Sequence, residues 1–168
     1  MSQENVEVVR GMYAAFGGLA GGGDIASYVA THWAPDAEYD PIEETGTIRG
    51  RDELVRWHER WFEAWDEFRA EVDEIIEAGD VVVAAITVHG RGGQSGTTIT
   101  QRLFHVCETR DGKLSRMGEY SDRETALKAA GWREEGPTSA SGNAERTAAR
   151  AGPEADSPEG AAPGATSR

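Results

Sequence analysis

Asp40 is a carboxylate in a short segment that otherwise has the character of a half-buried strand. The segment, residues 37–42, reads Ala-Glu-Tyr-Asp-Pro-Ile and lies between two stretches of helical periodicity. A carboxylate removed from water is costly unless it is paired or used, and in an apolar cavity it can serve as a general base. The sequence therefore makes Asp40 the first candidate for acid–base chemistry. The alternative is a side chain that binds backbone amides where the strand ends.

His58 is the second candidate, because it lies on the apolar face of a predicted helix that begins near Asp52. An imidazole there could pair with Asp40, and such a pair would suit dehydration or cyclisation. The alternative is a histidine that is satisfied by a backbone carbonyl. Three tryptophans are candidate contacts for a ligand, although such side chains more often belong to the core. They are Trp33, Trp57 and Trp61.

Composition excludes several other classes of function. The 168 residues include 30 acidic and 17 basic ones, for a net charge of -13, which argues against a nucleic-acid partner. Cys107 is the only cysteine, and the histidines lack the spacing of metal ligands, so we predict no metal. No apolar run approaches the length of a membrane span, and the first residues lack a signal peptide. We therefore expect a cytoplasmic protein with no membrane partner.

The apolar pattern places helices first and strands afterwards. Helical spacing covers residues 6–16 and 25–33 and begins again near Asp52, and a period of two starts at Phe68. A capping-box pattern at 121–124 predicts a short closing helix. Further strands are expected over residues 81–89, 97–109 and 114–120. This order predicts an α+β fold, in which a curved, mostly antiparallel sheet wraps around three N-terminal helices as a cone with an open mouth.

The end of the chain has a different composition. Residues 137–168 contain no Leu, Ile, Val, Met or aromatic residue. Such a segment cannot bury enough apolar surface to offset its chain entropy. We therefore expect a folded domain over residues 1–133 and a disordered tail over residues 134–168.

Several segments of the chain together resemble the nuclear transport factor 2-like superfamily, and within it the SnoaL-like group. The resemblance covers roughly residues 3–132. It is carried by residues 4–16, 33–41, 48–54, 110–114 and 119–122. The group includes ketosteroid isomerase, polyketide cyclases and small dehydratases. The resemblance therefore implies the cone-shaped fold, while function varies widely on such a scaffold.

The resemblance also implies roles for single residues. The general base of the isomerase is an Asp followed by Pro, which matches Asp40 and Pro41, and its oxyanion tyrosine matches Tyr13. Its second acid falls at Phe104, so steroid isomerisation itself is not expected. If the strands face as in the isomerase, four further residues point inward. They are Arg102, Phe104, Met117 and Glu119. The opposite facing of the first of these strands would instead place Gln101, Leu103, His105 and Cys107 inside.

These observations lead to two hypotheses about function. The first is a cofactor-independent isomerase, cyclase or dehydratase that acts on a small hydrophobic carbonyl compound, with Asp40 as general base and Tyr13 as oxyanion donor. No cofactor is needed, because the carbonyl of the substrate stabilises the carbanion. The second is a non-catalytic module that binds a small ligand or supports dimerisation. The resemblance further implies a homodimer.

Overall fold

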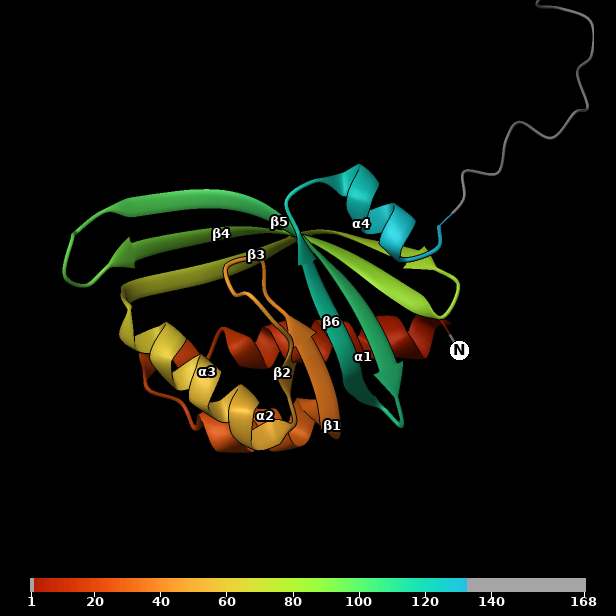
Figure 1. Cartoon of the computed structure of the whole chain (residues 1–168), viewed down its shortest axis with the longest axis horizontal. Coiled ribbons are helices and arrows are strands. Elements are labelled where there is room, and N and C mark those ends of the chain that lie inside the picture. Colours follow the sequence, from red (N-terminus) through yellow and green to blue (C-terminus); the bar gives the residue numbers. More distant parts are fainter. Residues whose placement is uncertain (1, 133–168) are drawn as a thin grey trace, which may run out of the picture. The chain divides into compact units, whose positions relative to one another are not determined.

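The computed structural model describes residues 2–132, in which three helices precede most of the strands (Figure 1). The helices are α1 (Ser2–Phe16), α2 (Ile25–His32), α3 (Arg51–Glu63) and α4 (Arg123–Ala129), with a 3-10 turn, η1, at Leu19–Gly21. The strands are β1 (Trp33–Asp40), β2 (Ile48–Arg49), β3 (Trp65–Ala78), β4 (Val81–Gly92), β5 (Thr98–Arg110) and β6 (Lys113–Tyr120). The predicted α+β fold is confirmed.

Two of the helices begin at aspartates whose side chains bind free backbone amides. Asp24 accepts a hydrogen bond of 2.9 Å from the amide of Ser27 at the start of α2. Asp122 accepts one of 2.9 Å from the amide of Thr125 at the start of α4. Each cap satisfies an amide that has no partner within its helix. The predicted capping box with Ser121 as the cap is therefore wrong by one residue.

All six strands form one curved, unclosed sheet in the order β2-β1-β6-β5-β4-β3. β1 and β6 are parallel, and the other neighbours are antiparallel. The first three helices lie on one side of this sheet and α4 lies on the other (Figure 1). The sheet therefore buries side chains on both of its faces, and the face toward α1–α3 is the inner one.

The facing of β5 differs from the expectation. Phe104 packs against Ala126 beneath α4, together with Val83, Ala85 and Val106, on the outer face of the sheet. Arg102 lies on the same face, half exposed, with its Nε 3.8 Å from a carboxylate oxygen of Asp73. The prediction that Arg102 and Phe104 point inward is therefore wrong, because α4 needs an apolar floor and Phe104 supplies it.

Because Arg102 and Phe104 point outward, the residues between and after them on β5 point to the inner face of the sheet. His105 lies opposite Glu119 of β6, and Cys107 lies opposite Met117, as the register of the two strands requires. Because residues opposite each other in a sheet share a face, the inward positions of Met117 and Glu119 bring His105 in with them. The expected positions of Met117 and Glu119 are confirmed.

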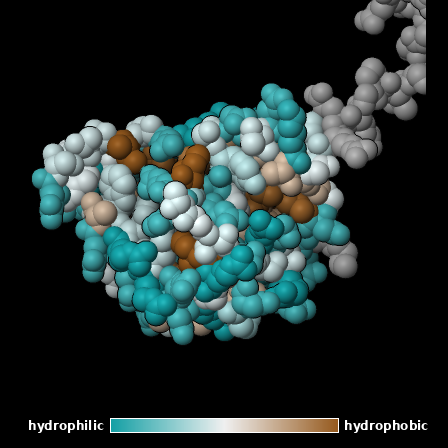
Figure 2. Space-filling view, viewed as in Figure 1, coloured by the Kyte–Doolittle hydropathy of each residue, from teal (hydrophilic) through white to brown (hydrophobic). Residues whose placement is uncertain are grey.

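The surface of this domain is mostly polar. Figure 2 shows a largely hydrophilic face on which hydrophobic residues form a few separate patches. The large apolar residues exposed among residues 2–132 are Ile42, Val72 and Trp132. None of the helices in this part of the chain is long and apolar enough to cross a membrane. The predicted tail, residues 134–168, lies outside the residues that the structure describes.

Gly90 provides a test of the packing at the open end of the sheet. A β-carbon at Gly90 would lie 2.7 Å from the ring of Trp65, whereas one at Gly11 on α1 would meet no atom within 4 Å. We predict that Gly90→Ala lowers the free energy of unfolding by about 1–3 kcal/mol, because the indole must move. Gly11→Ala, the control, should raise it by about 0.5–1 kcal/mol through helix propensity. Urea denaturation measures both, and a Gly90→Ala variant as stable as the wild type would contradict the packing described.

Candidate functional site

A cavity lies between the inner face of the sheet and helices α1 and α3. Its volume of about 70 Å³ is roughly five times the minimum volume that a cavity needs to hold one water molecule. Its mouth is bordered by exposed residues of the loop after β1 and of β5, including Ile42, Glu43 and Gln101. The remaining lining residues are Met12, Tyr13, Phe16, Trp33, Tyr39, Pro41, Trp57, His58, Trp61, Trp65, Phe68, Ala70, Ile86, Val88, Ile99, Leu103, His105, Met117 and Glu119. The cavity can therefore hold a small organic molecule.

Aromatic rings form much of its wall. Trp57 and Trp61, one helical turn apart on α3, stack with ring centres 5.9 Å apart. Trp61 also meets Phe68 of β3 edge to face at 4.1 Å, and Trp57 meets Tyr39 of β1 in the same way at 4.9 Å. Rings held by rings on three elements change position little, so the wall is preformed and suits a flat apolar ligand.

A chain of polar side chains interrupts this apolar lining. The Tyr13 hydroxyl lies 2.6 Å from Nδ1 of His105, and Nε2 of His105 lies 3.2 Å from Oε1 of Glu119. Glu119 accepts hydrogen bonds from the hydroxyl of Tyr39 and, at 3.1 Å, from the amide of Ile42. The chain therefore joins α1, β5, β6 and β1 within the cavity.

The contact between His105 and Glu119 is close but lacks the angle of a hydrogen bond. The 3.2 Å separation is short enough for a bond, yet Nε2 of His105 has no acceptor at a suitable angle among residues 2–132. A small rotation of the imidazole would align an N–H at Nε2 with Oε1 of Glu119. A carboxylate can only accept, so the contact assigns a proton to Nε2.

Burial and hydrogen bonding shift the pKa values of these polar side chains in opposite directions. Burial raises the pKa of Glu119, but the imidazole of His105 close beside it, together with the hydrogen bonds from Tyr39 and Ile42, outweighs burial and lowers that pKa overall. Burial raises the pKa values of Tyr13 and Tyr39 well above the usual value, and the charge of Glu119 adds to the shift. At neutral pH the site therefore contains one carboxylate and two protonated phenols.

His58 lines the cavity on the α3 side. It is 3 % exposed, and its Nδ1 lies 2.7 Å from the backbone carbonyl oxygen of Leu54, one turn earlier. Burial lowers the pKa of His58 to about 4 despite that bond. Nδ1 of His58 is thus satisfied by a backbone carbonyl, as the alternative interpretation of the sequence expected. The predicted pairing of His58 with Asp40 is not found among the contacts of residues 2–132.

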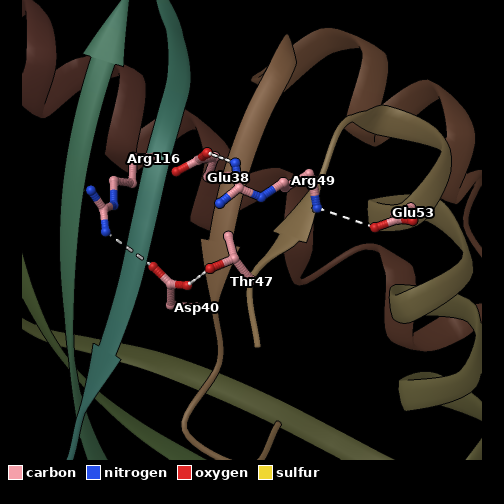
Figure 3. A network of polar contacts seen from close by, with 6 residues as sticks. All are labelled: Glu38, Asp40, Thr47, Arg49, Glu53 and Arg116. Carbon is pink, nitrogen blue, oxygen red and sulfur yellow. Dashed lines mark hydrogen bonds and ion pairs between the residues drawn. The ribbon is translucent and has the colours of Figure 1, made fainter. Parts of the chain in front are cut away.

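Asp40 lies outside the cavity. Its carboxylate accepts a hydrogen bond of 2.5 Å from Thr47 and lies 3.4 Å from Arg116, on the side of β1 that also carries Glu38 (Figure 3). The side chain is 36 % exposed. The prediction that Asp40 occupies an apolar hollow is therefore wrong, because strand residues alternate and Tyr39 takes the inner face.

The figure also shows what Asp40 does instead. Arg49 of β2 pairs with Glu38 at 2.6 Å, and its amide donates to Glu53 at 3.3 Å (Figure 3). Together with the contacts of Asp40, these bonds tie β2 and β6 to the two sides of β1. Exposed pairs of this kind contribute little to stability individually. The network positions strands and holds no group toward the cavity.

Seven of the ten predicted site residues line the cavity and three do not. Those that do are Tyr13, Trp33, Trp57, His58, Trp61, Met117 and Glu119, and those that do not are Asp40, Arg102 and Phe104. His105 was named only under the opposite facing of β5, and it proves central to the polar chain. Its signal in the sequence is its place two residues from both Leu103 and Cys107, which share its face.

The described residues offer no obvious metal site. Within residues 2–132 no three His, Cys, Asp or Glu side chains are grouped so that they could hold an ion. His105 and Glu119 are the nearest approach to such a group, and each is already engaged by a tyrosine. The groups that the polar chain brings to the cavity are an imidazole, a carboxylate and phenols.

Solved structures with the same fold come from several sources. An NTF2-like protein from Burkholderia pseudomallei is 24% identical, with a TM-score of 0.61 over 74% of this chain and 95% of its own. A protein with a ketosteroid isomerase-like fold from Catenulispora acidiphila, in complex with trimethylamine, is 20% identical, with a TM-score of 0.60 over 76% and 94%. TerC, co-crystallised with polyporic acid, is 25% identical, with a TM-score of 0.60 over 76% and 98%.

No curated protein matches the sequence significantly. The sequence profile of the SnoaL-like domain matches residues 9–117, which is well over half of the chain and includes most of the cavity lining. Both this match and the resemblance of the fold agree with the family expected from the sequence. The chain belongs to the SnoaL-like domain family.

Proposed function

We propose that this domain binds a small hydrophobic carbonyl compound and catalyses proton transfer on it, as an isomerase, cyclase or dehydratase without a cofactor. The observation that carries the proposal is the chain Tyr13–His105–Glu119 inside an otherwise apolar cavity. Buried polar chains of this kind are costly, and in a cleft they mark candidate catalytic groups. Asp40, the base expected from the sequence, has no part in the proposal.

The three residues have different roles. Tyr13 is the group that would contact the ligand, because it lines the cavity and its hydroxyl stays protonated. In the resting site its one O–H is donated to Nδ1 of His105, so its oxygen can accept a proton from the ligand. Once Nδ1 is protonated and donates to that oxygen, the hydroxyl can donate to the ligand oxygen on which negative charge has developed. His105 can take the proton of Tyr13 through Nδ1 or return one through the same atom. Glu119 orients the imidazole and stabilises its charged form, as the third member of a catalytic triad does.

A complete cycle balances through these atoms. A proton leaves the ligand for the Tyr13 oxygen as the Tyr13 proton moves to Nδ1 of His105, which leaves an imidazolium beside the Glu119 carboxylate. The reverse movement returns the proton to a different atom of the ligand and restores the site. Such transfers contribute about 10²–10⁴-fold to a rate. No oxidant, reductant or metal enters the cycle.

A second candidate is a cavity that binds the same kind of ligand without reaction. It is favoured by the full complement of partners around Glu119, which is satisfied by Tyr39, Ile42 and His105 before any ligand enters. A polar chain that needs no ligand can have a purely structural role. The complex of TerC with polyporic acid makes that compound a reasonable first probe of binding to this chain as well.

Exchange of hydrogen for deuterium separates the two candidates without a known substrate. We predict that the protein accelerates exchange of the α-protons of 2-tetralone in D₂O, followed by NMR. His105→Gln and Tyr13→Phe should each lower the protein-dependent rate by about 100-fold, because each breaks the path of the proton. Asp40→Asn, the control, should retain the rate within about twofold.

Each other result has a definite meaning. A thermal shift by 2-tetralone without exchange would favour the binding function. Exchange that survives in His105→Gln would remove the polar chain from the mechanism. Loss of exchange in Asp40→Asn with an unchanged melting temperature would restore the carboxylate that the sequence first suggested.

Stability should fall as the pH is lowered from neutral toward 4. The pKa of His58 is about 4 in the folded protein and about 6.5 when unfolded, so the unfolded chain binds the proton first. The stabilisation is complete above pH 6.5 and is lost as the pH falls toward 4, by about 3 kcal/mol at most. His58→Phe should flatten the pH dependence between pH 7 and 5. Urea denaturation at several pH values measures the difference, and equal slopes in both proteins would contradict the burial of a neutral imidazole.

A further inference from the structure

We propose that His58 binds a hydroxyl group of the ligand, so that the cavity selects hydroxylated carbonyl compounds over simple ketones. The inference rests on the proposed function for the carbonyl end of the ligand, which Tyr13 would hold. It concerns the α3 side of the same cavity, to which the proton path assigns no role.

The contact of Nδ1 fixes the tautomer of His58. The carbonyl oxygen of Leu54, 2.7 Å away, can only accept a hydrogen bond, so Nδ1 carries the proton. In a neutral imidazole the other nitrogen, Nε2, then has a lone pair and no hydrogen. His58 therefore presents the cavity with a hydrogen-bond acceptor.

No hydrogen bond to that acceptor is made among residues 2–132, although Trp33, whose Nε1–H has no partner, is a ring neighbour at 6.3 Å. The ring of His58 meets Trp57 edge to face at 5.0 Å, Tyr28 at 5.6 Å and Phe16 at 6.2 Å. Among residues 2–132, the hydrogen bond recorded for the ring is the one to Leu54. Nε2 of His58 is not among the fully enclosed polar atoms of residues 2–132 that lack a partner, so it is open to the cavity that His58 lines. A ligand with a suitable donor could bind it there.

His58 is an acceptor rather than a base. Burial lowers its pKa to about 4, so it is neutral at pH 7, and protonating it there would be about a thousandfold unfavourable. It therefore cannot efficiently take a proton from carbon, as the pairing with Asp40 would have required. Accepting a hydrogen bond at Nε2 needs no change in the charge of His58. The burial that makes His58 a weak base also makes it favour ligands that offer a hydrogen-bond donor over ligands that do not.

The chemistry of the ligand follows from the two ends of the cavity. Tyr13 can donate to a carbonyl oxygen once Nδ1 of His105 is protonated and donates to the Tyr13 oxygen. Nε2 of His58 accepts from a donor and disfavours a second carbonyl. The stacked rings of Trp57 and Trp61 in the cavity wall suit a flat ring system. A ring compound with a carbonyl at one end and a hydroxyl at the other satisfies all three.

Calorimetric titration with matched bicyclic probes tests this directly. The probes are 2-tetralone, its 5-, 6-, 7- and 8-hydroxy derivatives, and the methoxy derivatives of the same positions. We expect at least one hydroxy isomer to bind about 5- to 10-fold more tightly than 2-tetralone, as one additional hydrogen bond would allow. Its methoxy counterpart, which lacks the donor, should have no such advantage.

Variants assign the effect to His58. The ratio of affinities, hydroxy to unsubstituted probe, should fall to about 1 in His58→Phe and remain unchanged in Asp40→Asn. The inference is overturned if every hydroxy isomer binds no better than 2-tetralone, if the methoxy probe keeps the advantage, or if the advantage survives in His58→Phe. Because the methoxy comparison uses the wild-type protein, it decides the question even where the variant does not fold.

These outcomes are independent of those for the proposed function. Proton exchange depends on Tyr13 and His105, whereas the preference for hydroxyl depends on His58. Exchange without a hydroxyl preference overturns the inference alone, and a hydroxyl preference without exchange overturns catalysis alone. If none of the probes binds, both proposals fail.

Discussion

The charge of Glu119 is the constraint around which the cavity is arranged. A carboxylate so nearly enclosed must be paired, because the cost of removing it from water exceeds that of ordering its partners. Its donors come from the β1 strand, from the loop after it and from β5, as Tyr39, the Ile42 amide and His105. These contacts are met with the His105 face of β5 turned inward, which also places Phe104 under α4, and they hold the Ile42 amide close to the sheet.

The helices, five of the six strands along the chain and most boundaries could be predicted because their signals are local, whereas the short strand β2 and the order of the strands in the sheet were not predicted. Periodicity, aspartate caps and turns depend on residues close in sequence, and the SnoaL-like resemblance added the curvature of the sheet. The facing of β5 could not be predicted in this way. Residues 103–107 are all buried, since α4 covers one face and α1–α3 cover the other, so alternation carries no information there. In a strand that is buried on both faces, the sequence does not show which side chains point to which face.

Asp40 was misplaced although the sequence contained the correction. In the run Ala37-Glu38-Tyr39-Asp40, two carboxylates alternate with two apolar side chains, which places Asp40 on the same outer face as Glu38. Its match to the base of an isomerase outweighed that local pattern. The expected chemistry of the cavity was closer to what is found, since a carboxylate does occur there on β6. The homodimer and the cytoplasmic location remain predictions.

The carboxylate in the cavity is Glu119 of β6 and not Asp40 of β1, and this difference changes the role that a carboxylate can have there. A carboxylate that acts as a base must give up hydrogen bonds to its partners when it takes a proton. Each unit by which those partners lower its pKa makes protonation about 1.4 kcal/mol less favourable. Glu119 has three partners and a lowered pKa, so it is a poor base and a good anchor. The proton must then be carried by the group that Glu119 holds. His105 is that group, and because its other nitrogen meets Tyr13, the site can deliver a proton to a ligand only through the tyrosine.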